Sequence, residues 1–374
     1  MSPESSLAAV PKPAPMGAGA DTQVTLLDGG AEAYPRMLEA IESATRRVHL
    51  EVYTFEREGV GSSFVAALTA AAQRGVEVKV IVDGWGSMGE SGPLRATLRA
   101  AGARAHIYNP LTSIFTGRAW RNHRKILLVD DQVAFIGGIN IGDDYLGADD
   151  EPGWADLVLE LRGEICTQLG AKLQAGNVDL SSGPVRILLS GFGGGRRLRK
   201  RYLRALKQAK QQVVLAHAYF LPDRGFMRAL QQTAKRGVSV QLLLAGRSDV
   251  AFARAATMRL YRYFLKGGVR IHELTGSTLH AKAAVVDGKR LLMGSFNLDP
   301  LSMVNLETLV DVEDEGVAAQ ATAWLDKQLK GARPISLADC SRTGLQAWAL
   351  DILGLTGARL AEFFAHFIGR KRRR

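Results

Sequence analysis

The sequence has two cysteines and no long apolar run, and both shortages exclude classes of protein. Cys166 and Cys340 stand alone in 374 residues and form no CxxC pair. We therefore predict neither a disulfide framework nor a zinc site, and we expect a reducing compartment. No uncharged apolar run approaches the roughly 18 residues that a membrane-spanning helix needs. The N-terminus lacks the basic and apolar regions of a signal peptide, so we expect neither a signal peptide nor a transmembrane helix.

Charge is plentiful but unbalanced. The chain has 48 basic and 37 acidic residues, which gives a formal net charge of +11. Such an excess favours an anionic partner, and charge alone does not choose between nucleic acid and an anionic membrane surface. Hydrophobic residues make up 47% of the sequence, which is typical of a globular protein with a sizeable core.

The chain repeats one pattern of elements after residues 1–22, a stretch rich in Pro, Ala, Ser and Gly that we predict to be a disordered leader. Alternation and periodicity predict a strand, a helix and a strand in each copy. These elements are 46–55, 62–75 and 76–84 in the first copy, and 211–222, 225–237 and 238–246 in the second. The repeat predicts an α/β protein of two pseudo-twofold-related halves, each a mixed sheet flanked by helices.

The same repeat sets the expected domain boundaries. Residues 122–140 align with 279–297 at an offset of 157 (279 − 122). We predict a first domain over 23–178 and a second over 185–330, separated where Gly, Ser and Pro interrupt the pattern. A site shared by both copies is expected at the interface of the halves.

Each copy contains His-x-Lys, then four residues, then Asp. The motif residues are His123, Lys125 and Asp130 in the first copy, and His280, Lys282 and Asp287 in the second. Residues two apart on a strand point to one face, so each histidine and its lysine should project together. One such motif arises by chance, but two inside an internal repeat do not. We predict that these six residues are catalytic, although each aspartate ends a strand and could instead orient a neighbour or be structural.

The residue types suit attack on a phosphodiester. One neutral histidine can act as the nucleophile while the other, protonated, acts as the general acid. The lysines can stabilise the phosphoryl oxygens, and three further polar residues, Asn140, Ser295 and Asn297, are predicted to help them. A carboxylate on the far ring nitrogen would fix each histidine's tautomer, the role predicted for Asp156 and Glu307. This chemistry requires no metal and no cofactor.

The duplicated HxKxxxxD motif resembles the signature of the phospholipase D superfamily. The resemblance covers residues from about 24 to 330, and within the superfamily the chain is similar to bacterial cardiolipin synthases that lack N-terminal transmembrane helices. The segments that carry this similarity are 26–56, 74–87, 123–141 and 218–223.

Membership of this superfamily would imply a phosphohistidine intermediate. By analogy, His123 would be the nucleophile and His280 the acid, although the pseudo-symmetry also permits the reverse. The implied reaction makes cardiolipin from phosphatidylglycerol and a second phospholipid. The implied location is peripheral, on the cytoplasmic face of the bacterial inner membrane, and the oligomeric state stays open.

Two further features have a functional and a structural interpretation. Glu51, Tyr53 and Tyr219 lie near strand ends, where they could line a head-group pocket or pack in the core. Residues 340–374 are rich in Trp, Leu, Ile and Phe and end in five basic residues. This composition favours an amphipathic, polybasic segment that associates with anionic membranes, and the alternative is helices packed on the core.

Two other functions remain open from sequence alone. Water could resolve the same intermediate, which would make the protein a phospholipase D-type hydrolase or a nuclease. Nucleic acid is the less favoured substrate, because superfamily nucleases are often single-motif chains and this chain carries both motifs. A membrane- or nucleic-acid-binding module with a decayed site is the non-enzymatic alternative, although no motif residue is damaged.

Overall fold

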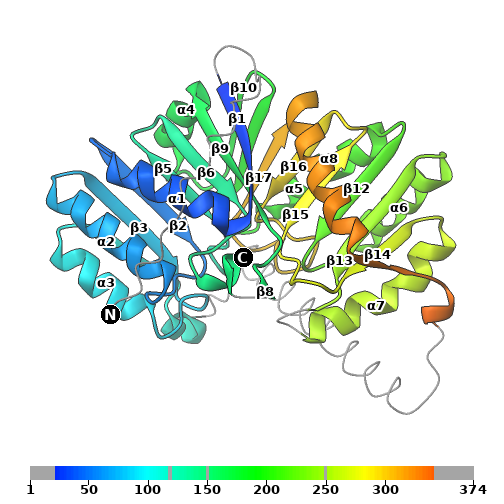
Figure 1. Ribbon diagram of the computed structural model, residues 1–374, viewed down its shortest axis with the longest axis horizontal. Coiled ribbons are helices and arrows are strands. Elements are labelled where there is room, and N and C mark those ends of the chain that lie inside the picture. The colour runs from blue at the N-terminus through cyan, green and yellow to red at the C-terminus, as the bar shows by residue number, and fades with distance from the viewer. Residues whose placement is uncertain (1–21, 117–119, 149–150, 248–250, 341–374) are drawn as a thin grey trace.

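The computed structural model describes residues 22–116, 120–148, 151–247 and 251–340. The predicted leader, apart from its last residue, and the predicted C-terminal segment beyond residue 340 lie outside the described residues. Two sheets form the protein, one from each half of the sequence, and Figure 1 shows them side by side with helices on their outer faces.

The first sheet has seven strands in the order β1-β9-β6-β5-β2-β3-β4. Strands β2, β3 and β4 are parallel to one another, whereas β5, β6 and β9 pair antiparallel. The strands are β1 (Thr22–Asp28), β2 (Arg47–Val52), β3 (Glu77–Asp83), β4 (Arg104–Tyr108), β5 (Ile126–Val129), β6 (Val133–Gly137) and β9 (Leu157–Gly163). The helical elements of this half are α1 (Gly29–Glu42), α2 (Val60–Gln73), α3 (Ser91–Ala100), η1 (Leu111–Thr116), η2 (Asp143–Tyr145) and α4 (Glu164–Lys172), and β7 (Gly147–Ala148) and β8 (Glu151–Pro152) form a separate small hairpin.

The second sheet repeats this order and adds one strand at each edge. Its order is β10-β11-β17-β16-β15-β12-β13-β14-β18. The strands are β10 (Val178–Ser182), β11 (Val185–Ser190), β12 (Gln212–His217), β13 (Ser239–Ala245), β14 (Arg270–Leu274), β15 (Lys282–Val286), β16 (Arg290–Gly294), β17 (Glu307–Val312) and β18 (Ala332–Ile335). The helical elements are α5 (Gly195–Gln208), α6 (Arg224–Lys235), α7 (Ala251–Lys266), α8 (Glu315–Lys330) and η3 (Ala338–Cys340). The predicted fold of two related mixed sheets flanked by helices is confirmed.

The residues expected to separate the halves belong to the second sheet. Residues 179–184 contain most of β10 and its tight turn into β11, and the two strands pair antiparallel. Gly183 sits at the turn with φ of +54°, a conformation that glycine adopts at little cost. The Gly and Ser residues here therefore mark a hairpin inside the second sheet.

A shared hydrophobic core joins the halves. One cluster of buried side chains contains Leu159 and Ile165 from the first half together with Val310 and Trp324 from the second. Two further clusters fill the space between each sheet and its outer helices. Because the halves share a core, the residues at their seam are held by packing from both sides.

The described helices do not include one long and apolar enough to cross a bilayer.

Candidate active site

The two motif histidines lie just before β5 and β15, where each half meets the other. The backbone amide of His123 donates a hydrogen bond to the carbonyl of Leu306 at 2.9 Å, and that of His280 donates to the carbonyl of Ala155 at 2.9 Å. Each histidine segment is therefore fastened to the opposite half of the protein. The two histidines therefore lie at the interface of the halves, as the sequence predicted.

The carboxylates cross between the halves. Glu307, from the second half, lies 3.0 Å from Nδ1 of His123, in the first. Asp156, from the first half, lies 2.7 Å from Nδ1 of His280, in the second. The carbonyl oxygen of Ser295 is a further acceptor 3.2 Å from His123 Nδ1. With two acceptors at Nδ1, that nitrogen carries the proton and Nε2 is left with its lone pair.

The two carboxylates are themselves held differently. Glu307 accepts hydrogen bonds from the hydroxyls of Ser295 at 2.5 Å and Ser302 at 2.8 Å. In the first half Gly138 stands in place of Ser295, and a Cβ there would lie 2.3 Å from both carboxylate oxygens of Asp156. No side chain fits at that position while Asp156 reaches His280, so the sequence difference between the copies has a steric cause.

Both motif lysines are buried beside the histidines. The ammonium of Lys282 lies 3.0 Å from both ring nitrogens of His280, and Lys125 donates to the carbonyl of His123 at 2.9 Å. Burial, followed by the nearby Lys282 cation, lowers the pKa of Lys125 well below its usual value. A bound phosphodiester anion would favour the charged form of Lys125, and both lysines could then donate to its phosphoryl oxygens.

Burial sets the protonation of both imidazoles. It lowers the pKa of His280 to about 4, with help from the Lys282 cation and against the Asp156 carboxylate. Burial also lowers the pKa of His123, and Glu307 opposes that shift. Both rings are therefore neutral at pH 7 in the free protein, which is the state a nucleophilic imidazole requires.

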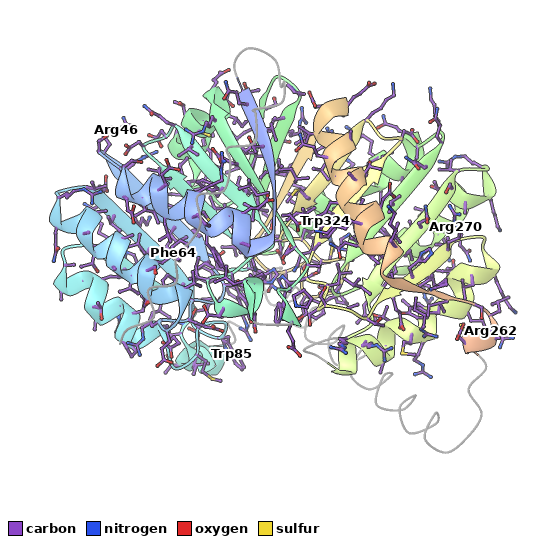
Figure 2. The ribbon with its side chains drawn as sticks, viewed as in Figure 1. Arg46, Phe64, Trp85, Arg262, Arg270 and Trp324 are labelled. Carbon is purple, nitrogen blue, oxygen red and sulfur yellow. The ribbon has the colours of Figure 1, made fainter. Side chains whose placement is uncertain are left out.

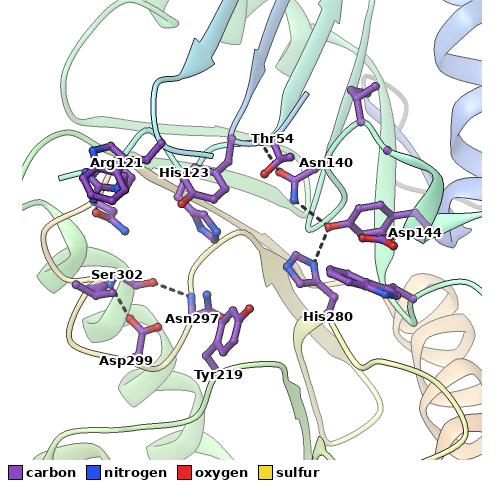
Figure 3. A pocket seen from close by; sticks show the side chains of 18 of the residues that line it. Thr54, Arg121, His123, Asn140, Asp144, Tyr219, His280, Asn297, Asp299 and Ser302 are labelled. Carbon is purple, nitrogen blue, oxygen red and sulfur yellow. Dashed lines mark hydrogen bonds between the residues drawn. The ribbon is translucent and has the colours of Figure 1, made fainter. Parts of the chain in front are cut away.

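A cavity of about 490 Å³ opens over the two histidines. Figure 3 shows His123 and His280 on its walls, with Asn140 above them in the view and Asn297 and Tyr219 below. Its other lining residues are Tyr53, Thr54, Glu56, Trp85, Arg121, Ile141, Gly142, Asp144, Tyr145, Trp154, Leu221, Asp299, Pro300, Leu301, Ser302 and Asn305.

Two predicted pocket residues line this cavity. The ring of Tyr53 lies 5.1 Å from that of His123, and the ring of Tyr219 lies 6.5 Å from that of His280, measured between centroids. The side chain of Asn140 accepts from the amide of Thr54 at 3.1 Å.

Glu51 is placed elsewhere. Its buried carboxylate lies 3.0 Å from a ring nitrogen of His49 and accepts from the side-chain amide of Asn122 at 3.0 Å. It does not line the 490 Å³ cavity. The pocket-lining interpretation of Glu51 is therefore corrected in favour of the packing alternative.

Asp130 and Asp287 also lie away from the cavity, so their prediction as catalytic residues is corrected. Each follows its strand with a positive φ, +51° and +54°, in a turn. The Asp130 carboxylate accepts from the amides of Thr45, Arg46 and Arg47. That of Asp287 accepts equivalently from the amides of residues 210–212. Both carboxylates fasten a turn to the start of a neighbouring strand.

Asp130→Ala is expected to lower the free energy of unfolding by about 1–3 kcal/mol, because three amides lose a charged acceptor. These bonds, working against partial burial, lower the pKa of Asp130. Its stabilisation is therefore present above the unfolded pKa of about 3.9 and is lost as pH falls through the lower folded value. Urea unfolding at several pH values measures this. A fully stable variant with no turnover would instead give Asp130 a chemical role.

Several cavity residues lie outside the predicted set. Tyr145 and Trp154 pack on His280, with ring centroids 5.6 and 5.4 Å away. Arg121 lies over the ring of Trp85 at 4.2 Å. Arg121 lies two residues before His123, so its proximity to the first motif is a sequence signal, whereas Ser302 lies 22 residues after His280 (302 − 280).

Within the part of the chain that the structure describes, no three His, Cys, Asp or Glu side chains gather as a metal site would require.

The chain is similar to known cardiolipin synthases. The family described as "Cardiolipin synthase, PLD-like domain" matches twice, at residues 37–164 and 202–329. Cardiolipin synthase B of Escherichia coli (strain K12) is 33% identical over 317 residues, which cover 78% of this chain and 76% of that protein. Cardiolipin synthase 1 of Staphylococcus epidermidis is 29% identical, with coverage of 84% and 69%.

A solved structure supports the fold. Phosphatidylserine synthase of Haemophilus influenzae superposes with a TM-score of 0.73 at 14% identity, covering 90% of this chain and 93% of that one. The matching family domain occurs once in each half, and each copy contains one His-x-Lys motif. The chain therefore belongs to the phospholipase D superfamily, in the family of cardiolipin synthase PLD-like domains.

Proposed function

We propose that the protein is a phosphatidyltransferase that makes cardiolipin from phosphatidylglycerol and a second phospholipid. The observation that carries this proposal is the pair of neutral, carboxylate-bound histidines that face one cavity, each with a buried lysine beside it. The names of the relatives supply the substrate class, since they are cardiolipin synthases.

The first half-reaction forms a covalent intermediate. Nε2 of His123 attacks the donor's phosphorus, and the bond from phosphorus to the head-group oxygen breaks. His280 gives its proton to that oxygen, and the head group leaves as a neutral alcohol. The phosphatidyl group stays on His123, and Lys125 and Lys282 stabilise the charge of the five-coordinate transition state.

The second half-reaction reverses these roles. A free hydroxyl of the phosphatidylglycerol head group gives its proton to neutral His280 and attacks the same phosphorus. The bond from phosphorus to His123 breaks, so His123 regains its lone pair and cardiolipin leaves. His280 is protonated again, as the first half-reaction requires.

The bound substrate supplies the charge that lets His280 hold a proton. In the free protein the Lys282 cation is one cause of the low His280 pKa. A phosphodiester anion beside that cation offsets its effect, so the His280 pKa rises when the donor binds. Asp156 then stabilises the imidazolium.

The cavity rim fits a membrane surface. Met88 lies three residues after Trp85, which lines the cavity, Leu111 follows the neighbouring strand β4, and Leu301 itself lines the cavity. Their side chains are 63%, 40% and 47% exposed. Apolar side chains around a lipid-binding cavity gain free energy by entering the bilayer interface. The net charge of +11 would direct the protein to the anionic cytoplasmic leaflet.

Met88→Glu is expected to weaken binding to phosphatidylglycerol vesicles about tenfold, because a partly inserted apolar side chain becomes an anion facing anions. Gln232→Glu makes a similar change on α6, at an exposed position away from the rim, and should bind almost as well as the parent. Vesicle co-sedimentation measures both. Equal weakening in the two variants would show that only overall charge matters.

The proposed reaction is tested by its products. The purified protein is incubated with phosphatidylglycerol vesicles, alone and with phosphatidylethanolamine, and the lipids are extracted and separated. Cardiolipin and the freed alcohol are expected. Phosphatidic acid alone would make the protein a hydrolase, and cleavage of DNA without lipid turnover would make it a nuclease.

A further inference from the structure

A second cavity, of about 380 Å³, lies at the seam between the halves. It is bounded by the start of α1, the end of α8, the β7–β8 hairpin and the loop after β14. Figure 1 shows α1 beginning near the middle of the view and α8 running down the side of the second half that faces it. The cavity therefore draws its walls from both halves, as the catalytic cavity does.

The two cavities share a wall beside His280. Tyr145 and Trp154 line both of them. The Tyr145 hydroxyl lies 3.3 Å from Nδ1 of His280, and the Trp154 ring centroid lies 5.4 Å from that of the imidazole. Trp154 is partly exposed and has space on both sides. Rotation of its side chain would join the cavities next to the proposed general acid.

The lining of the second cavity is polar on one side. Lys327 and Asp28 form an ion pair at 3.1 Å, and the indole of Trp324 donates to Asp28 at 2.7 Å. Gln328 and Ser277 add an amide and a hydroxyl. Such groups exchange hydrogen bonds with a small polyol more readily than they accommodate acyl chains.

The proposed reaction releases a small polar alcohol that a polar cavity could accept. When the catalytic cavity faces the bilayer, both lipids reach His123 from the membrane side. The alcohol freed from the donor is water-soluble, and leaving through the lipid-covered opening would carry a polar molecule into apolar surroundings. Figure 2 places Trp85, of the catalytic cavity, at the lower edge of the view and Trp324 near its centre.

We propose that the second cavity is the passage by which the small head-group alcohol leaves and enters the site, past Trp154. This inference rests on the proposed phosphatidyl transfer and extends it. The alcohol that His280 protonates moves behind the Tyr145 and Trp154 rings into the polar cavity and then into water. Free glycerol in the buffer enters by the same path and accepts the phosphatidyl group in reverse.

Two reactions separate this passage from the catalytic site. Incorporation of deuterated glycerol from buffer into phosphatidylglycerol requires a small alcohol to move in and out. Exchange of a labelled phosphatidyl group between cardiolipin and phosphatidylglycerol requires none, because each alcohol is itself a lipid. Both reactions use the same histidines and lysines.

Gln328→Trp fills the second cavity from α8, and Asp326→Trp places the same side chain on an exposed face of that helix. We expect Gln328→Trp to slow glycerol incorporation about tenfold, leaving lipid-to-lipid exchange within about twofold of the parent. Asp326→Trp should match the parent in both reactions. Ser277→Trp, which fills the cavity from the other half, should behave as Gln328→Trp does.

The passage is ruled out if both filled variants incorporate glycerol at the parent rate. It is equally ruled out if both lose the two reactions together, because the effect would then lie at the catalytic site or in folding. A parent protein that exchanges phosphatidyl groups between lipids but never incorporates glycerol also contradicts it. If the parent protein catalysed neither reaction, the proposed phosphatidyl transfer itself would be contradicted.

Discussion

His123→Ala is expected to reduce cardiolipin formation by about 10⁴-fold or more, because the variant has no atom to carry the phosphatidyl group. His280→Ala should lose a comparable factor with a natural donor, since the departing alkoxide then receives no proton. Lipid products from vesicles measure both rates. Circular dichroism and thermal unfolding serve as controls for folding.

A donor with an activated leaving group separates the two roles. Phosphatidyl-p-nitrophenol releases a phenolate that needs little protonation, so His280→Ala should release close to one equivalent of it and then stop. His123→Ala should release none. A burst from His123→Ala and none from His280→Ala would assign the nucleophile to the second half. Steady turnover by both variants would mean that the histidines are not the catalytic groups.

Removing either carboxylate is expected to slow transfer by about 10²–10⁴-fold, because the imidazole loses its fixed tautomer and the stabilisation of its charged form. Asp156→Asn and Glu307→Gln keep the shape of each side chain and remove its charge. Asp287→Asn is the matched control, since that carboxylate lies outside the cavity. It should retain transfer within a few fold of the parent.

The crossed geometry predicts which histidine each variant alters. Glu307 raises the pKa of His123 and Asp156 raises that of His280. Glu307→Gln should therefore lower the pKa of His123, in the opposite half, and Asp156→Asn should lower that of His280. Titration of the two imidazoles by NMR measures this. If each variant altered the histidine of its own half, the crossed contacts would be wrong.

The duplication in the sequence predicted most of the architecture. The strand–helix–strand units at 46–84 and 211–246 occur as β2-α2-β3 and β12-α6-β13, with parallel pairing in each. The crossing of the carboxylates could not be predicted in this way. Asp156 and Glu307 each follow their own motif, and only the packing of one half on the other brings each to the opposite histidine.

The motif aspartates show where a linear pattern misleads. Asp130 lies seven positions after His123 (130 − 123), and an extended chain of that length spans about 23 Å. The two residues must therefore lie at opposite ends of the strand, and Asp130 cannot share the cavity. The repeat also gave no reason to predict Tyr145 as a site residue. Its equivalent position in the second copy is Ser302 (145 + 157), so the two copies share no residue type there.

The most direct test of the central claim is the site of the covalent intermediate. The protein is mixed with phosphatidylglycerol vesicles, quenched within one turnover under conditions that preserve phosphohistidine, digested and examined by mass spectrometry. We expect a phosphatidyl adduct on the peptide that contains His123, formed together with cardiolipin and absent from His123→Ala. Cardiolipin formed while the adduct sits on the His280 peptide would reverse the roles of the halves. Cardiolipin formed with no adduct on either histidine would contradict the account.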